Sequence, residues 1–323
     1  MRRREILLGS LATAACASSV RAQTSRSPVI AVLSINQNSR VCDTLASELA
    51  RSGWTVGQTV SCVLYGSGGR IENLHGVVQT LLTNRVDVIV ALSGTAAAAA
   101  AAATREFPIV MAASGFDPIG AGWAASYARP GGNVTGLTLA NDEAIDKQLE
   151  LLKEIAPSIR HLGLLRTRGN EANRVVADRA LAVASTFGLA ATVGEVAGSA
   201  ELTPALNRLR LAGADALLVV ADPAIDPLRQ TIAEFAIRYG LPTVGQISFY
   251  ADAGFLITYA PDIDAVHRRA AVFVDRILRG AKPGDLPIER PSRFVLTLNA
   301  KTAASIGLTI PPALTTLADE VIE

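Results

Sequence analysis

Residues 84–122 read NRVDVIVALSGTAAAAAAAATREFPIVMAASGFDPIGAG. Val86–Leu92 is a nearly continuous apolar run of strand length, which is typical of a parallel strand covered on both faces. Ser93–Thr95 can end that strand, and Ala96–Ala103 have the highest helix propensity of any residue type. After a proline, a second apolar run covers Ile109–Ala113. The stretch therefore predicts a strand, a helix and a further strand of a parallel α/β sheet.

The turn at Ser93–Thr95 is the first candidate for a ligand site. Ligands of open α/β sheets bind at the carboxyl ends of the strands, where this turn is expected. The start of the following helix offers free N–H groups and the positive end of a dipole to an anion such as a carboxylate. Ser93 and Thr95 add hydroxyl groups, although a serine here can also be a plain helix cap. We expect both residues to contact a ligand.

The second half of the chain repeats the order of the first. Four landmarks recur after 132, 135, 128 and 134 residues: Pro28 and Arg160, Gly53 and Gly188, Asp87 and Asp215, and Pro108 and Pro242. So constant a spacing predicts two similar Rossmann-like lobes, each an α/β unit with a parallel sheet wrapped by helices. Two lobes whose strand ends face each other form a cleft, and such a pair usually closes on a ligand by a hinge motion.

The same patterns extend over the whole chain. Strands are expected at about 28–34, 58–65, 160–165, 191–196, 214–220, 241–244, 254–259 and 293–298, and helices at 41–52, 71–84, 174–187, 203–212 and 264–278. Pro204 is expected in the first turn of its helix, where proline is tolerated. One lobe should comprise 28–137 plus about 260–290, and the other 138–259 plus about 291–323. About three crossings, near 137, 258 and 290, should hinge them.

The first 22 residues are typical of an export signal peptide. Arg2–Arg4 form a basic segment, Ile6–Ala17 an apolar segment too short to span a bilayer, and Val20–Ala22 a cleavage site. A Sec signal and a twin-arginine signal both fit these residues. A lipoprotein anchor at Cys16 fits less well, because Thr13 stands where that motif usually has leucine. We expect a periplasmic protein.

Charge excludes one class of partner. Of 30 basic and 29 acidic residues, cleavage after Ala22 would remove four arginines and one glutamate, which leaves a formal charge of −2. Without a basic excess or an arginine-rich face, nucleic acid is not an expected partner. The later apolar runs are strand-length and interrupted by charge, so we expect no second membrane segment.

Cys42 and Cys62 remain after cleavage. An oxidising compartment permits a disulfide between them, and a first helix packed on the second strand would bring them together. Two buried free thiols are the alternative.

Further candidate ligand contacts follow other strands. Ser34 and Asn36 come directly after the first strand, at the same sheet edge as Ser93. Asp117 can accept an ammonium group, although an Asp-Pro pair is also a common turn. Asp222 follows the second lobe's third strand, at the position equivalent to Ser93–Thr95, and it too can pair with an amine.

The later strands of the second lobe supply the remaining candidates. Gln246, Phe249 and Tyr259 follow or end these strands, and either aromatic ring can stack on an apolar ligand or pack in the core. Arg166 or Arg168 can clamp a carboxylate through two hydrogen bonds, although surface arginines are common.

Catalytic and cofactor motifs are absent from the sequence. The three histidines, His75, His161 and His267, have no metal-ligand spacing. Gly66–Gly69 lacks the spacing of a dinucleotide fingerprint, and no Gly-x-Ser-x-Gly elbow occurs. We therefore expect no metal, no cofactor and no enzymatic activity.

Several segments resemble one family, the substrate-binding proteins of ABC transporters of the tryptophan or aromatic amino-acid-binding kind, within the type I periplasmic binding proteins. The most specific is ARPGGNVTG at 128–136; the others are 93–95, 117–120, 149–153, 281–287, 307–312 and 318–323. The chain departs from the family at the cleft edges. Ala96 replaces a usual proline, and 166–173 and 258–261 also differ, which bears on the ligand and leaves the fold expectation intact.

The resemblance implies a monomeric extracytoplasmic receptor that closes on an amino acid or related carboxylate. Its expected partners are an ABC permease and the ATPase of that importer. An exported sensor that signals through a membrane receptor is an alternative, because the single chain would look the same. A Rossmann-type cofactor enzyme is a weaker alternative, since the fingerprint is missing and an export signal is present.

Overall fold

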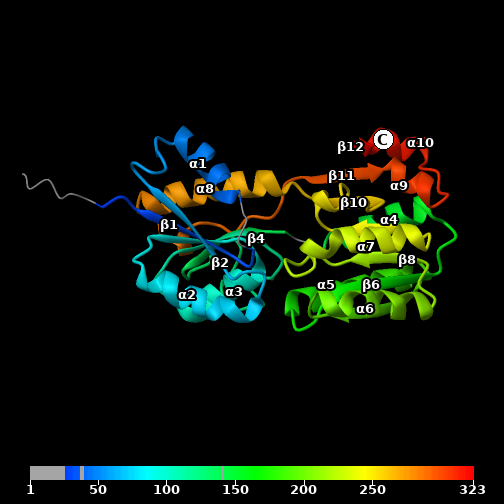
Figure 1. Cartoon of the computed structure of the whole chain (residues 1–323). Helices are drawn as coiled ribbons and strands as arrows, with labels where there is room; N and C mark the ends of the chain where they lie inside the picture. Colours follow the sequence, from blue (N-terminus) through cyan, green and yellow to red (C-terminus); the bar gives the residue numbers. More distant parts are fainter. Residues whose placement is uncertain (1–25, 37–39, 140) are drawn as a thin grey trace, which may run out of the picture.

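A computed structural model describes residues 26–36, 40–139 and 141–323, so the expected signal peptide at 1–22 and Cys16 lie outside the described residues. The chain forms two α/β lobes that lie side by side (Figure 1). Each lobe contains one sheet. A separate cluster of buried apolar residues lies on each face of each sheet. None of the described helices is long and apolar enough to cross a bilayer.

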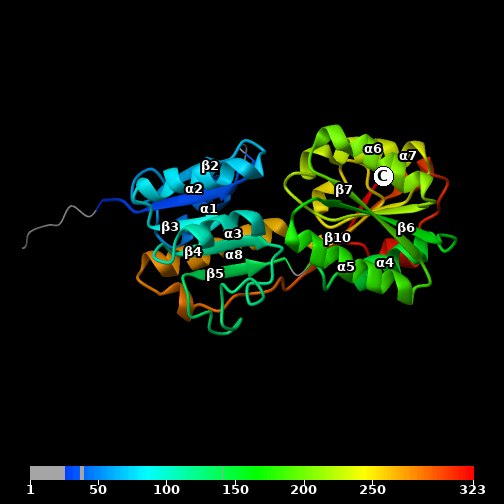
Figure 2. The same cartoon turned by 90° about the horizontal axis from the view of Figure 1, so that it is seen from below.

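The first sheet is entirely parallel, in the order β2-β1-β3-β4-β5. Its strands are β1 (Val29–Ser34), β2 (Ser61–Gly66), β3 (Val88–Ala91), β4 (Ile109–Ser114) and β5 (Val134–Thr138). One face is covered by α1 (Val41–Arg51) and α8 (Ile263–Leu278); the other by α2 (Leu74–Thr83), with the short helix η1 (Ile71–Asn73) before it, and α3 (Gly94–Ala103). Helices therefore cover both faces, as the continuous apolar strands require (Figure 2).

The second sheet repeats this order and extends it. Its order is β12-β11-β10-β9-β8-β6-β7, and only the β10–β11 pair is antiparallel. The strands are β6 (His161–Thr167), β7 (Ala190–Val196), β8 (Ala216–Val219), β9 (Thr243–Gly245), β10 (Ile257–Pro261), β11 (Phe294–Asn299) and β12 (Glu320–Ile322). Strands β7-β6-β8-β9-β10 match β2-β1-β3-β4-β5 one for one, which confirms the duplicated lobes.

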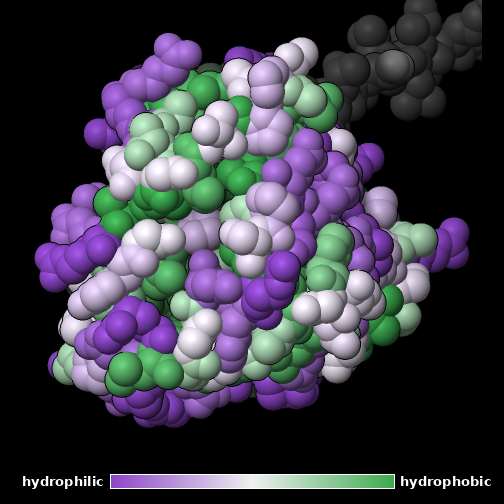
Figure 3. Space-filling model, turned by 90° about the vertical axis from the view of Figure 1, so that its right-hand side faces the viewer, coloured by the Kyte–Doolittle hydropathy of each residue, from purple (hydrophilic) through white to green (hydrophobic). Residues whose placement is uncertain are grey.

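The helices of the second lobe also form two layers. They are α4 (Ile145–Ile155), α5 (Glu171–Thr186), α6 (Ser199–Leu211), α7 (Arg229–Arg238), α9 (Ala300–Ser305) and α10 (Pro312–Leu317), with the short helices η2 (Asp226–Leu228) and η3 (Ser248–Tyr250); η4 (Pro283–Asp285) lies beside β5. The end of this lobe that faces away from the first lobe carries intermixed hydrophilic and hydrophobic residues (Figure 3).

The alanine run forms α3 as predicted, and its small side chains decide how it packs. Ala96, Ala97, Ala100 and Ala101 are fully buried against the first sheet and α2. Side chains this small let a helix approach its neighbours closely, while the high propensity of alanine stabilises the helix itself. The start of α3 is thereby fixed at the carboxyl end of β3.

The chain passes between the lobes three times (Figure 1). It leaves the first sheet after β5, returns after β10 to form α8, and crosses again before β11. On its last passage the backbone of Glu289 bonds to β5: its N–H donates to Gly136 and its carbonyl accepts from Thr138, at 2.8 and 3.0 Å. These passages lie near the positions predicted for the hinge.

Strand β5 was not predicted, because glycines interrupt its apolar pattern. Gly136 has φ of +117°, and a Cβ added to it would lie 2.3 Å from the carbonyl oxygen of Met111 in β4. Only glycine fits a backbone that approaches its neighbour this closely. The residue that obscured the strand in the sequence is thus required by the strand's packing.

The prediction for Pro204 was wrong. Helix α6 begins at Ser199, so Pro204 is its sixth residue and lies on the exposed side of the helix. The polar first turn carries no apolar pattern that would reveal it. Instead the Glu201 carboxylate accepts a hydrogen bond from the Ala197 N–H at 3.2 Å and stabilises this start.

Cys42 in α1 and Cys62 in β2 form a disulfide, with their Cα atoms 5.9 Å apart. The sequence left a disulfide and two buried free thiols as alternatives, and the structure contains the disulfide. It links the first helix of the first lobe to the edge strand of the sheet.

Removing this bridge should lower the free energy of unfolding by about 3 kcal/mol, because the disulfide closes a loop of 20 residues in the unfolded chain. Guanidinium chloride unfolding with and without reductant measures the difference. The double variant Cys42→Ser/Cys62→Ser should show the lower stability in both conditions. Alkylation of both thiols in unreduced, denatured protein would contradict the bridge.

Candidate functional site

A cleft of about 900 Å³ lies between the lobes. Its walls come from the loops that follow the strands of both sheets, which is where open α/β sheets bind ligands. The first lobe contributes polar groups and one aromatic ring: Ser34, Asn36, Ser93, Thr95 and Phe116. The second contributes an amide, three ionisable groups and another ring: Asn170, Asp222, Asp226, Arg229 and Phe249. Asn141, in the segment between the lobes, and His267 of α8 line it as well.

The first-lobe wall presents the start of α3. Ser93 is the N-cap, and its hydroxyl oxygen accepts a hydrogen bond from the Ala96 N–H at 3.1 Å. The N–H groups at the first positions of a helix have no partner within the helix, so those of Gly94 and Thr95 are available to an anion. Ser34 is held in a similar turn, with its hydroxyl accepting from the Asn36 N–H at 3.1 Å.

Asp222 is the buried carboxylate of the second-lobe wall. It accepts hydrogen bonds from the Ala224 N–H at 2.8 Å and from the Asn170 side-chain amide. Burial raises the pKa of the Asp222 carboxyl above its usual 3.8, although these hydrogen bonds oppose the shift. No lysine or arginine forms an ion pair with it among the described residues.

Asp226 adds a second carboxyl one turn further on. Its carboxyl lies against Tyr250, whose hydroxyl donates to Oδ1 at 2.8 Å. The Arg229 guanidinium bonds instead to the backbone carbonyl of Asp226, at 2.7 Å. Burial raises the pKa of Asp226 to about 7, and burial beside this carboxyl holds the pKa of the Tyr250 phenol well above 10. The second wall therefore carries two buried carboxyl groups and one guanidinium.

Asn141 supplies an unused acceptor. The side chain is 6% exposed, and its amide oxygen is buried with no hydrogen-bond partner in the described part of the chain. An unpaired buried acceptor is costly, so this atom is suited to accept a hydrogen bond from a ligand. It follows β5, at the edge where the other site residues gather.

Three predicted residues lie outside the cleft. The Asp117 carboxylate accepts from the N–H groups of Ile119 and Gly120, at 3.1 and 2.9 Å, and so forms the turn that was its alternative. Gln246 is buried, and its amide bonds to Gln148 and to the backbone of Ala221. Tyr259 stacks on Phe294 with ring centroids 5.3 Å apart. Ser34, Asn36, Ser93, Thr95, Asp222 and Phe249 are brought together in the cleft.

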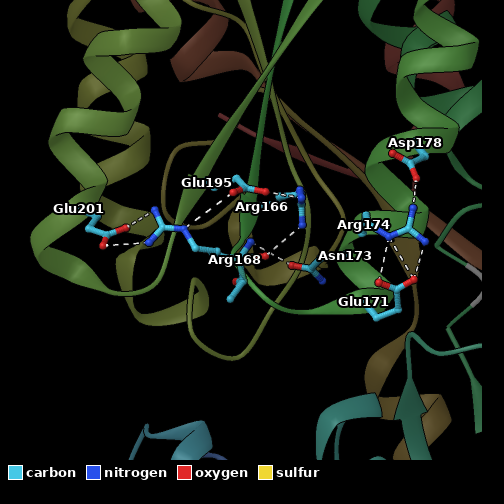
Figure 4. Close-up of polar contacts among 9 residues, drawn as sticks. Arg166, Arg168, Glu171, Asn173, Arg174, Asp178, Glu195 and Glu201 are labelled. Carbon is cyan, nitrogen blue, oxygen red and sulfur yellow. Dashed lines mark hydrogen bonds and ion pairs between the residues drawn. The ribbon is translucent and has the colours of Figure 1, made fainter.

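The two candidate arginines are held by acidic partners (Figure 4). Arg166 forms an ion pair with Glu195, and Arg168 forms one with Glu201 at 2.9 Å. Neither lines the cleft between the lobes; both line a smaller surface pocket of the second lobe. The arginine of the cleft is Arg229, at the start of α7.

Sequence reasoning missed several residues of the cleft, Asn170 and Asn173 of the second lobe among them. Asp226 and Arg229 lie four and seven positions after Asp222, so a longer scan of the same loop would have included them. Asn141 follows a strand that was not predicted, and Phe116 precedes Asp117, which was chosen instead. His267 carries no signal, because only packing brings α8 to the cleft; burial lowers the pKa of its imidazole.

No group of three or more histidine, cysteine, aspartate or glutamate residues suited to a metal ion occurs within 26–36, 40–139 and 141–323. The polar groups of the cleft are amides, hydroxyls, backbone N–H groups, two carboxyls, the Arg229 guanidinium and the His267 imidazole, a set that can bind both ends of a small zwitterion.

Relative to the wild type, the unliganded Asp226→Asn variant should become progressively more stable as pH rises from about 4 to about 7, because it lacks a titrating carboxyl at this position. In the wild type the folded state keeps its proton up to about pH 7, whereas an unfolded carboxyl loses it near pH 3.8. In the wild type, the contribution of Asp226 to the free energy of unfolding is therefore complete below about pH 4. It falls by ~1.4 kcal/mol per pH unit between there and about pH 7. Chemical unfolding of both proteins from pH 4 to 8 measures this. If the free energies of unfolding of the wild type and the variant change in parallel with pH, the pKa of Asp226 in the folded protein is not raised.

Comparison with known proteins gives the chain its family. Residues 28–322 match the family described as ABC transporter substrate binding protein. A tyrosine-binding protein of Clostridioides difficile (strain R20291) is 23% identical over 260 residues, which cover 80% of this chain and 74% of that protein.

Solved structures share the whole fold. The ABC domain in complex with L-Trp from Streptococcus pneumonia is 26% identical, with a TM-score of 0.84 over 91% of this chain and 99% of that one. A conserved domain protein from Vibrio cholerae is 24% identical, with a TM-score of 0.84 over 92% and 100%. The two α/β lobes of the present chain, with their mostly parallel sheets, have the type I periplasmic binding protein fold. The chain belongs to the family of ABC transporter substrate-binding proteins, which are solute-binding receptors.

Proposed function

We propose that the cleft binds an L-amino acid with an aromatic side chain and that the protein delivers it to an ABC permease and its ATPase. The observation that carries the proposal is the opposite polarity of the two walls of the cleft. The start of α3 on the first wall suits a carboxylate, and the unpaired Asp222 on the second wall suits an ammonium group. The names of the tyrosine-binding and L-Trp-bound relatives agree with this class of ligand.

The ammonium and carboxylate groups of the ligand would each find specific partners in the cleft. The ammonium group would neutralise Asp222, whose burial is costly while it has no cation, and would donate to Asn141 Oδ1. The carboxylate would satisfy the first N–H groups of α3 and accept from Thr95. The side chain would then lie among the apolar residues of the cleft, such as Leu139, Val176 and Ile247.

Binding energy of this kind is available only when both walls reach the ligand. We propose that 28–137 plus about 260–290 moves as one unit against 138–259 plus about 291–323, bending at the three passages between the sheets. In this proposal the protein is a monomer in the periplasm, exported by the segment at 1–22, and it performs no covalent chemistry.

Calorimetry with amino acids and their truncated analogues tests the ligand class. The protein comprising residues 23–323 should bind at least one of L-tyrosine, L-tryptophan and L-phenylalanine. Tyramine lacks the carboxylate and 3-(4-hydroxyphenyl)propionate lacks the ammonium group, so both should bind far more weakly than L-tyrosine. If none of the standard amino acids binds or raises the melting temperature, the proposed ligand class is wrong.

The variant Asp222→Asn should weaken amino-acid binding roughly thirtyfold or more, because it removes one partner of a buried charge pair. Its effect on 3-(4-hydroxyphenyl)propionate should be small, since that analogue has no cation to pair. Asp117→Asn, outside the cleft, is the matched control and should bind as the wild type does. Equal losses for L-tyrosine and the propionate would show that Asp222 only supports the fold.

A further inference from the structure

One phenylalanine of the cleft, Phe116, is fixed by an unusual amount of local structure. It follows β4, where the pairing with β5 shifts register between Ala112 and Ser114. Ala113, at this bulge, has φ of +104°, a conformation that a residue with a Cβ rarely adopts. Bulges re-aim side chains at functional sites, and strain of this kind persists only where the surroundings impose it.

The ring of Phe116 is also held on two sides. A Cβ added to Gly94 would lie 2.1 Å from Phe116 Cδ2, so the ring rests directly on the backbone at the start of α3. The indole of Trp123 stacks on it, with ring centroids 5.6 Å apart and planes inclined by 30°. The Phe116 N–H donates to the Ser114 hydroxyl at 3.2 Å. The first wall therefore carries an aromatic ring in a defined place beside the expected carboxylate site.

The second wall carries a matching ring. Phe249 belongs to η3, and Tyr250 packs edge-on against it with centroids 5.5 Å apart. The Arg229 guanidinium lies 5.3 Å from the centre of the Phe249 ring, a distance at which a cation and an aromatic face attract. Phe116 and Phe249 thus come from different lobes and line the same cleft.

We propose that Phe116 and Phe249 form a clamp that selects an aromatic side chain by stacking on it from both lobes when the cleft closes. The other apolar residues of the cleft that carry large side chains, including Val41, Leu92 and Val220, are aliphatic and favour any apolar group alike. Offset stacking and edge contacts between rings add attraction that aliphatic contact lacks. This inference rests on the proposed function and assigns its specificity to two residues.

Ligands of similar size with and without an aromatic ring test the clamp. The wild type should bind the aromatic amino acids L-tryptophan, L-tyrosine or L-phenylalanine more tightly than L-cyclohexylalanine, which has a saturated ring. Phe116→Leu and Phe249→Leu should each reduce that preference roughly threefold to tenfold, mainly by weakening the aromatic ligands. Phe187→Leu replaces a half-buried phenylalanine outside the cleft and should keep the wild-type preference.

Two further measurements separate stacking from a general loss of structure. Gly94→Ala should displace the Phe116 ring without removing it and should lower the aromatic preference, while binding of L-cyclohexylalanine reports whether the rest of the cleft is intact. The protein has two tryptophans, so Trp54→Phe leaves Trp123 as the single emitter. Its fluorescence should change when L-phenylalanine binds, because Trp123 stacks on Phe116.

The possible failures are distinct. If the wild type binds no amino acid, the proposed function is wrong and the clamp proposal is wrong as well. If the wild type binds aromatic amino acids but Phe116→Leu and Phe249→Leu weaken L-cyclohexylalanine equally, the receptor assignment stands and the clamp is wrong. An unchanged preference in both variants also overturns the clamp.

Discussion

Parallel strand pairing is the constraint on which the site depends. Parallel neighbours need a crossover connection, usually a helix, so the loops that follow their carboxyl ends gather at one edge of the sheet. Side chains distant in sequence, such as Ser34, Ser93 and Phe116, therefore meet at that edge. Duplication of the lobe supplies a second such edge, and the cleft is the space between the two.

The two edges differ in charge, and this difference gives the cleft its polarity. The first wall offers hydroxyls and the N–H groups of α3, whereas the second buries the carboxyl groups of Asp222 and Asp226, with the Arg229 guanidinium on the backbone carbonyl of Asp226. Burying an unpaired carboxyl destabilises the folded protein, and a ligand that supplies the cation removes that cost. In the proposed function, this cost in the empty receptor favours closure around a ligand that carries both charges.

Much of this arrangement could be predicted because it depends on local pattern. Apolar runs and helix-forming residues placed most strands within a few residues, and the repeated spacing identified the second lobe. Six of the predicted contacts lie in the cleft, at or shortly after the carboxyl end of a strand. Where packing overrides pattern, prediction failed: Gly136 conceals β5, Glu201 stabilises an earlier start for α6, and Asp117 completes its own turn.

The sequence by itself determined the two-lobed α/β fold, the duplication and the strand ends at which a ligand would bind, because these follow from hydrophobic periodicity and turn residues close together in the chain. Only the tertiary structure decided which groups share the cleft. Tyr259 stacks on Phe294, Gln246 is buried against Gln148, and Arg166 and Arg168 pair with acidic side chains, while Asn141, Asp226 and Phe116 line the cleft. Those choices depend on burial, charge pairing and a strained bulge between residues far apart in sequence, which no local pattern encodes.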